Sequence, residues 1–295
     1  MRYHAPSREA VDAAVFGRPP LAAWREYTAW LQGAAWPSIE QLNARLAPGA
    51  AQLFVAQTPA LLADGLHYEQ RIAERGDIAT REGNWHDLLN AMVWLRYGAI
   101  KRALNRRQVA EVARMGQRQR SRPQCAMTHF DEAGVIVAVR EPALLALWDA
   151  HDWHGLFWRQ RQAWLDGSIT LQVFGHALLE HALSPDRLLV GKALVFQLAS
   201  GAEPADLAAR CAQAIDQGRL LNDPLELRPL PLSGIPGWHA GNDDEAFHRT
   251  AACYQQKRVG RVYPVPSLGE VWRGGRAGDE VDQQHQSMMI GASAS

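Results

Sequence analysis

The chain has 295 residues, of which 47% are hydrophobic and 21% charged, and its formal net charge is zero. This composition is typical of a globular protein with one large domain or two ordinary ones, and it excludes overall electrostatic attraction to nucleic acids or membranes. No apolar run approaches the ~18 residues of a membrane span, and the amino terminus lacks an apolar signal segment. Cys125, Cys211 and Cys253 are far apart and form no CxxC pair, which argues against a zinc ribbon and predicts a reducing, cytoplasmic location.

The chain begins with a polar lead, residues 1–20, which we expect to lie along the body of the protein. Residues 21–240 are expected to form the main domain. Within it, Ala51–Ala56 has the composition of a short strand. Leu66–Ala73 is expected to pair with a strand at Asp77–Arg81 across a glycine turn, so that a hairpin directly precedes a long helix.

This long helix is predicted to follow Asn84, whose side chain can cap the first turn, with Asp87 three residues later. Seven apolar residues fall on one broad arc and are expected to be buried: Leu88, Leu89, Ala91, Met92, Val93, Leu95 and Ile100. The opposite arc carries residues typical of binding sites or polar pockets: His86, Asn90, Trp94, Tyr97 and Lys101. Since the helix dipole disfavours imidazolium in the first turn, His86 is predicted to be neutral and suited to metal ligation or base chemistry.

A basic segment runs from Arg96 to Arg122, with nine basic residues against one acid, Glu111. The basic residues are Arg96, Lys101, Arg102, Arg106, Arg107, Arg114, Arg118, Arg120 and Arg122. Such a segment can contact phosphates, which predicts weak, salt-sensitive contact with nucleic acid. The alternative is a solvated helix face followed by a flexible linker at 117–122.

The second half of the chain alternates between short elements. Ala126–Val139 predicts two strands around a Glu-Ala-Gly turn, since Gly134 permits the positive φ that a hairpin needs. The pattern then predicts helices at 142–147, 156–165, 176–183 and 204–217, and strands at 169–174 and 190–198. From Asp223 the chain is Pro-rich and expected to be extended. Residues 241–274 are expected to wrap the surface, and 275–295 to be disordered.

A second candidate element, Phe174–Leu183, has His176 and Glu180 four residues apart on one helix face. If this helix packs against the first, the two could supply ligands to one divalent metal ion. The candidate ligands are His86, His176, Glu180 and Asp131, with Asp87 as an alternative to Asp131 and an orienting role open to either. The sequence has no nucleotide or flavin motif and neither GxSxG nor HExxH.

Four residues are candidates for catalytic roles beside such a metal: His86, Asn90, Arg81 and Lys101. Arg81 or Lys101 would neutralise negative charge that develops on a substrate. The alternative is that His86 and Asn90 only connect the helix to a neighbouring loop, since buried polar groups are usually hydrogen-bonded for structural reasons. His151 and His154 could also bind a metal, but their loop-like segment is more typical of exposed side chains.

Several blocks, in order, resemble the bacterial domain-of-unknown-function family 3025: TREGNWHDLLNAMVWLRYGAIKRALN, HFDEAGVIVAV, FGHALLEHAL, GKAL and LPLSGIPGW. The likeness covers roughly residues 20–240, and Asn-Trp-His-Asp-Leu and Phe-Gly-His-Ala-Leu-Leu-Glu are its most specific parts. After Trp238 the chain diverges, with FHRTAACYQQKR where the family continues with an aromatic-rich segment. The resemblance implies a bacterial, cytosolic protein and no particular reaction.

We therefore expect an α+β fold, a helix-rich single compact unit with short antiparallel hairpins and an extended Pro-rich C-terminal segment. Two functions are compatible with the sequence. One is a metal-assisted hydrolase that acts on a phosphodiester or a similar substrate. The other is a non-catalytic protein that binds a ligand, a nucleic acid or another protein. Convergence of His86, His176 and a carboxylate within metal-ligand distance would favour the first.

Overall fold

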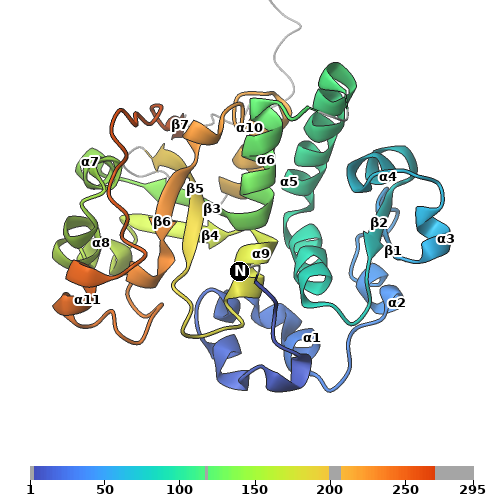
Figure 1. Ribbon diagram of the computed structural model, residues 1–295, viewed down its shortest axis with the longest axis horizontal. Coiled ribbons are helices and arrows are strands. Elements are labelled where there is room, and N and C mark those ends of the chain that lie inside the picture. Colours follow the sequence, from blue (N-terminus) through green and yellow to red (C-terminus); the bar gives the residue numbers. More distant parts are fainter. Residues whose placement is uncertain (1–2, 117–118, 199–206, 270–295) are drawn as a thin grey trace, which may run out of the picture.

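The computed structural model describes residues 3–116, 119–198 and 207–269. It has the expected α+β fold, in which helices dominate. A mixed sheet with its covering helices forms one side of the molecule, and a two-stranded sheet with short helices forms the other. The long helix α5 (Trp85–Met115) runs between them (Figure 1). Because α5 contacts elements on both sides, this one helix can present side chains to each of them.

In the described residues the strands form two sheets. The small sheet pairs β1 (Leu53–Ala56) in parallel with β2 (Asp77–Thr80). The larger sheet has the strand order β4-β3-β5-β6, and β7 also pairs with β5. Its strands are β3 (Gly134–Val139), β4 (Ile169–Val173), β5 (Val190–Leu198), β6 (Arg228–Pro231) and β7 (Ser267–Gly269). Every residue of β3 is buried and this strand pairs in parallel with β5, so the two strands form the centre of the core.

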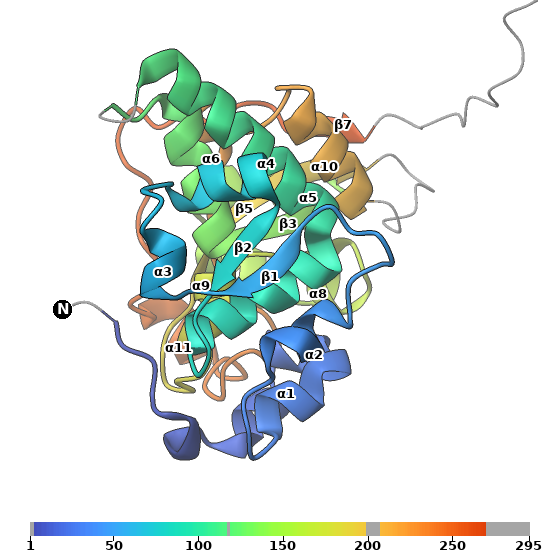
Figure 2. The same ribbon diagram turned by 90° about the vertical axis from the view of Figure 1, so that its right-hand side faces the viewer.

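Helices cover both sheets, and Figure 2 shows α4 and the small sheet lying in front of α5. The short helices are α1 (Thr28–Gln32), α2 (Ile39–Asn43), α3 (Pro59–Leu62), α4 (Tyr68–Arg75), α8 (Gln162–Leu165), α9 (His176–His181) and α11 (Glu245–Thr250). The longer ones are α6 (Arg122–Ala133), α7 (Pro142–Ala150) and α10 (Leu207–Asp216). The helix predicted at 156–165 is divided into a π-helical turn, Gly155–Arg159, and α8.

Helix α5 begins where the sequence predicts. Asn84 accepts a hydrogen bond from the backbone N–H of Asp87 at 3.1 Å, so the first turn is capped. Six of the seven residues of the predicted apolar arc are buried, with Leu89 fully inaccessible, and Leu95 is partly buried. The opposite arc is largely covered as well, since Trp94 and Lys101 are both buried. The polar side chains of this arc therefore line the interior of the protein.

The hairpin predicted from Leu66–Ala73 and Asp77–Arg81 is wrong. Residues Tyr68–Arg75 form α4, and β2 pairs with β1 in parallel instead. Gly76 ends α4 in the left-handed conformation, with φ 75°, and turns the chain into β2. A short apolar segment fits a helix or a strand equally well, and its sequence pattern does not identify a distant parallel partner.

The hairpin predicted over 126–139 is also wrong. The first part of this segment belongs to α6 (Arg122–Ala133), and only its end forms a strand. Helix α6 starts with a capping box at Ser121, inside the segment that was interpreted as a flexible linker. Gly134 has φ −67° and makes no hairpin turn. A Cβ atom there would lie 2.2 Å from the carbonyl oxygen of Phe130, so glycine is needed for close packing. In the described chain the antiparallel pairs, β3–β4 and β5–β6, are separated by helices in the sequence.

The Pro-rich segment after Asp223 contributes β6 to the larger sheet, paired with β5. The following residues pack against the body through α11 and β7. Asn242 is fully buried, and its side-chain amide donates a hydrogen bond to the carbonyl oxygen of Ser233 at 2.9 Å. The tail predicted to be disordered, 275–295, lies outside the described residues.

The polar lead lies along the body of the protein, as expected. Val15 and Phe16 are buried, and Arg8 donates two hydrogen bonds to the carbonyl oxygen of Gly33, directly after α1. Tyr3 extends to α9, where its hydroxyl group donates to the carbonyl oxygen of Glu180 at 3.0 Å. The start of the chain is therefore close to the candidate site.

Among the described residues, no helix combines the length and the apolar character that crossing a membrane requires. Cys125, Cys211 and Cys253 are all unpaired thiols. The cytoplasmic location stays a prediction.

Candidate metal centre

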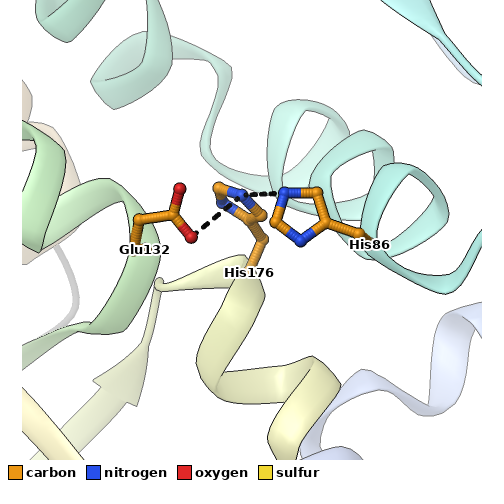
Figure 3. A group of neighbouring side chains, drawn as sticks. All are labelled: His86, Glu132 and His176. Atoms are coloured by element: carbon orange, nitrogen blue, oxygen red, sulfur yellow. Dashed lines mark hydrogen bonds and ion pairs between the residues drawn. The ribbon is translucent and has the colours of Figure 1, made fainter. Parts of the chain in front are cut away.

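His86 and His176 lie beside each other, as predicted (Figure 3). His86 comes from the first turn of α5, and His176 is the first residue of α9. Their Nε2 atoms are 3.0 Å apart and the rings are nearly perpendicular. The side chain of His176 is 5% exposed and that of His86 is 34% exposed. One ring is therefore part of the interior, whereas the other is accessible to solvent.

Glu132, in the last turn of α6, completes a group of three. Its carboxylate oxygen lies 3.7 Å from Nε2 of His176. One ligand atom from each of Glu132, His86 and His176 lies within 4.8 Å of the other two. Within the described parts of the chain, this is the one group of His, Cys, Asp and Glu side chains with metal-ligand spacing. Two imidazole nitrogens and one glutamate oxygen are the protein ligands of a common type of catalytic zinc site.

Contact between two glycines sets the distance between α6 and α9. Gly134 follows α6 and Gly175 precedes α9, and the N–H of Gly175 donates to the carbonyl oxygen of Gly134 at 2.9 Å. A Cβ atom on Gly175 would lie 2.4 Å from the backbone nitrogen of Gly134. Only glycine permits this approach, which brings Glu132 and His176 together.

The second nitrogen of each ring faces a carboxylate. Nδ1 of His86 is 2.9 Å from Oε2 of Glu180, and Nδ1 of His176 is 3.8 Å from Oδ2 of Asp131. Nδ1 of His176 is buried and has no hydrogen-bond partner in the described structure. The hydrogen bond with Glu180 favours hydrogen on Nδ1 of His86, and this leaves the lone pair of a neutral ring on Nε2. Asp131 favours the same tautomer of His176 through its charge alone.

If both Nε2 atoms carry lone pairs, their separation of 3.0 Å calls for a cation between them; otherwise one ring donates its Nε2 hydrogen to the other. The hydrogen bond with Glu180 raises the pKa of His86 despite partial burial, so a proton can be that cation. Burial lowers the pKa of His176 to about 3, so this ring is neutral. The directly bonded carboxylate of Glu180 thus shifts the pKa of His86 in the direction opposite to the one expected from the helix dipole, and the neutral state of His86 stays a prediction.

A buried lysine joins Asp131 to α5. Nζ of Lys101 donates to Oδ1 of Asp131 at 2.7 Å and to the side-chain oxygen of Asn90 at 2.9 Å. The amide of Asn90 donates in turn to the hydroxyl group of Tyr68 at 3.0 Å. Burial opposes the ammonium form of Lys101, but Asp131 and Tyr68 outweigh burial and raise its pKa. Lys101 therefore holds Asp131 beside the ring of His176.

The two neighbouring acids of α6 respond differently to burial. Burial alone would raise the pKa of Asp131, but the charge of Lys101 and its hydrogen bond act against burial and the pKa is lowered. The pKa of Glu132 is raised, first by burial and then by the charge of Asp131. Asp131 is therefore held as an anion, whereas the negative charge of Glu132 is unfavourable unless a cation lies nearby.

Arg81 lies at the outer side of the histidine pair, before α5. Its Nε and Nη2 atoms donate to the carboxylate of Asp87 at 3.0 and 2.8 Å, and its backbone N–H donates to the same group. The side chain is half-exposed. Asp87 therefore fixes a solvent-accessible guanidinium group close to His86.

Two cavities border His86. The first, of about 590 Å³, lies between α5, α4 and α6, and its lining includes Glu132 and His176. The second, of about 780 Å³, lies between the lead, the loop before α5 and α9. Among the described residues, Arg81 and His86 alone line both cavities. The candidate centre is thus accessible from two sides.

The structure brings the predicted site residues into one neighbourhood but assigns them different positions. Glu180 and Asp131, predicted as metal ligands, face the Nδ1 atoms and not the space between the rings. Glu132 was missed because the hairpin interpretation placed it in a turn. The capping box at Ser121 was the signal for a helix that continues through Glu132.

The basic segment is largely paired within the chain. Five of its nine basic residues form ion pairs: Arg96, Lys101, Arg106, Arg114 and Arg122, with Glu26, Asp131, Asp216, Glu111 and Asp223 respectively. Arg107 donates to Asn222 at 2.7 Å, and Arg118 lies outside the described residues. This pairing leaves less positive charge available for a nucleic acid, and contact with nucleic acid stays a prediction.

Comparison with known proteins gives a family and no activity. No curated protein and no solved structure matches this chain. A family model described as a protein of unknown function (DUF3025) matches residues 52–258. The match contains α5, α6 and α9, and it continues past Trp238, where the sequence was expected to diverge. The chain that carries this histidine and glutamate centre therefore belongs to the DUF3025 family.

Proposed function

We propose that this protein is a metal-assisted hydrolase whose divalent cation is bound by His86, His176 and Glu132. One observation carries the proposal: ligand atoms of His86, His176 and Glu132 lie within 4.8 Å of one another. The Nδ1 atom of each histidine, on the other side of the ring, faces a carboxylate. Metal-binding histidines typically have such a carboxylate behind the ring, because it orients the ring and strengthens the ligand. A proton alone could occupy the space between the rings, but it would not account for the third group, Glu132.

The charges around the rings also support a cation. Four carboxylates and two cationic side chains surround the pair: Asp87, Asp131, Glu132, Glu180, Arg81 and Lys101. With both imidazoles neutral, two negative charges are left without compensation. A divalent cation neutralises this excess and relieves the raised pKa of Glu132.

The surrounding residues divide the remaining tasks. A bound cation would lower the pKa of a water molecule and polarise the bond under attack. Glu180 and Asp131 orient the two rings, and Lys101, which also donates to Asn90, holds Asp131 in place. Arg81 is the accessible positive group that would bind a negatively charged substrate, a phosphodiester or a similar molecule.

Metal binding tests the first half of the proposal. Chelator-treated protein is titrated with Zn²⁺, Mn²⁺ and Mg²⁺ by calorimetry, and we expect one tight site. His176→Ala should lower the metal affinity by more than about 100-fold, which exceeds the usual effect of losing a residue that only orients a ligand. His129→Ala is the matched control, because His129 is an exposed histidine of α6 outside the ligand group. Equal affinities in the wild type and in His176→Ala would refute the site.

Hydrolysis of bis(4-nitrophenyl) phosphate tests the second half. We expect turnover that requires the added metal and is lost in His176→Ala. Tight metal binding without turnover on any hydrolysable ester would favour the other function, a non-catalytic protein whose pocket binds a ligand or a macromolecule.

A further inference from the structure

The position of His86 between the two cavities carries information about the substrate. Its Nε2 atom faces His176, which lines the first cavity, whereas its Nδ1 atom faces Glu180, which lines the second. The imidazole ring therefore forms part of the wall between the cavities. Arg81, the other shared residue, is fixed beside it by Asp87.

The first cavity is long. Its lining follows α5 from His86, past the kink at Tyr97, to Val112. Side chains of α4 form one wall and those of α6, such as Met127 and Thr128, form the other. A cavity of about 590 Å³ whose lining extends over several turns of helix on both sides of this kink is a groove rather than a round pocket. A groove of this form suits a chain-like part of a ligand.

The second cavity is on the other side of the ring of His86 from the first. It is lined by residues 3–9 of the lead, by the loop before α5 and by Ala177, Glu180 and His181 of α9. The lead is held there, since the ring of Tyr3 contacts that of His181 with centroids 4.5 Å apart. The lead therefore forms one wall of this cavity.

We propose that the substrate is a phosphodiester with an organic group on each side of the phosphorus, one in each cavity, and its single negative charge between Arg81 and the metal centre. This inference rests on the proposed function. A phosphomonoester has one organic group and would leave one cavity empty, and an uncharged ester or amide would not use Arg81. In the reaction, water oxygen bonds to phosphorus, one P–O ester bond breaks, and the departing oxygen takes a proton, which gives an alcohol and a phosphomonoester.

Binding tests the shape of the substrate without turnover. Diphenyl phosphate and phenyl phosphate, at equal concentrations of metal-loaded protein, are compared by calorimetry, and we expect diphenyl phosphate to bind at least tenfold tighter. Two variants narrow one cavity each: Gln57→Trp in the first and Ala177→Trp in the second. Gln57 is close to Arg81, where the cavities meet, because its N–H donates to the carbonyl oxygen of Thr80, the residue before Arg81. Both variants should lower the affinity for diphenyl phosphate at least fivefold, whereas at most one of them should lower the affinity for phenyl phosphate.

The controls separate shape from folding and from chemistry. Ala60→Trp, an exposed position of α3 outside both cavities, should change neither affinity. Ser7→Trp is a second variant in the second cavity and avoids α9, should Ala177→Trp disturb the neighbouring His176. This inference is overturned if diphenyl phosphate binds no tighter than phenyl phosphate, or if only the variants of one cavity lower its affinity. Neither result contradicts the metal centre. The expected binding pattern without turnover supports the two-sided site and counts against the hydrolase.

Discussion

Two regions of the protein are rich in histidine, and they use it in opposite ways. In the metal centre, His86 and His176 direct their Nε2 atoms at each other, with carboxylates behind the rings. Under the C-terminal segment, His248 has both ring nitrogens engaged, Nδ1 with the hydroxyl group of Tyr254 at 2.9 Å and Nε2 with the carbonyl oxygen of Asn242 at 2.8 Å.

His151, a loop histidine that the sequence suggested as a possible metal ligand, also has both ring nitrogens engaged. His151 contacts the carbonyl oxygen of Gln255 at 3.0 Å and the hydroxyl group of Tyr263 at 2.7 Å. A ring bonded to a carbonyl group and a hydroxyl group has no nitrogen left for a metal. The comparison teaches that the partners of the two nitrogens, rather than the number of histidines, distinguish a binding site from a structural contact.

Among the changes that test this comparison, removal of the acid behind His176 should have the largest effect, which is on metal affinity. Asp131→Asn replaces the carboxylate behind His176 with a neutral group, and we expect the metal affinity to fall about 10- to 100-fold. Glu245→Gln changes the acid that faces His154 at 2.8 Å and serves as the control, with unchanged metal affinity. If both variants bind metal like the wild type, the carboxylate behind His176 has no orienting role.

A histidine of the other region should matter for stability instead. His248→Ala removes a buried ring and leaves the carbonyl group of Asn242 and the hydroxyl group of Tyr254 without these partners. We expect the free energy of unfolding to fall by about 1–3 kcal/mol in denaturant titrations. Metal affinity should stay within about twofold of the wild type, and a large loss of it would mean that the two regions are coupled.

The pH dependence of metal binding should report the proton between the rings. The pKa of His86 is raised, so below that value the metal must displace a proton, and affinity should fall about tenfold per pH unit as the pH decreases. Above the raised pKa this dependence on His86 disappears. Glu180→Gln removes the main cause of the shift and should move the onset of the decline to lower pH. A profile that is identical in this variant would contradict the role of Glu180.

The smallest effect is expected from the basic segment, which belongs to neither histidine region. Because Arg106 and Arg122 already pair with Asp216 and Asp223, any binding to a single-stranded oligonucleotide should be weak and should decrease steeply between low and physiological salt. Fluorescence anisotropy measures this directly. Tight binding that is indifferent to salt would show that these ion pairs open for a specific ligand.

Much of the site could be predicted from local sequence, because helix caps and first-turn positions are local properties. Asn84 and the spacing of His176 and Glu180 placed both helices and the approach of His86 to His176. The third member, Glu132, depends on whether its segment is a helix or a hairpin, and apolar periodicity alone does not decide this. The parallel pairing of β1 with β2 was also missed, because it joins segments separated by two helices.

The contact between Gly175 and Gly134 has a consequence for the choice of ion. Because main-chain atoms fix how closely α9 approaches α6, the gap between Glu132 and His176 does not adjust freely to the ionic radius. A methyl group at Gly175 would act as a spacer between the two helices and would disfavour a small ion whose bonds to nitrogen are about 2.0–2.1 Å long. Selectivity for cation size is then a property of the backbone, and it could be redesigned without replacing a single ligand.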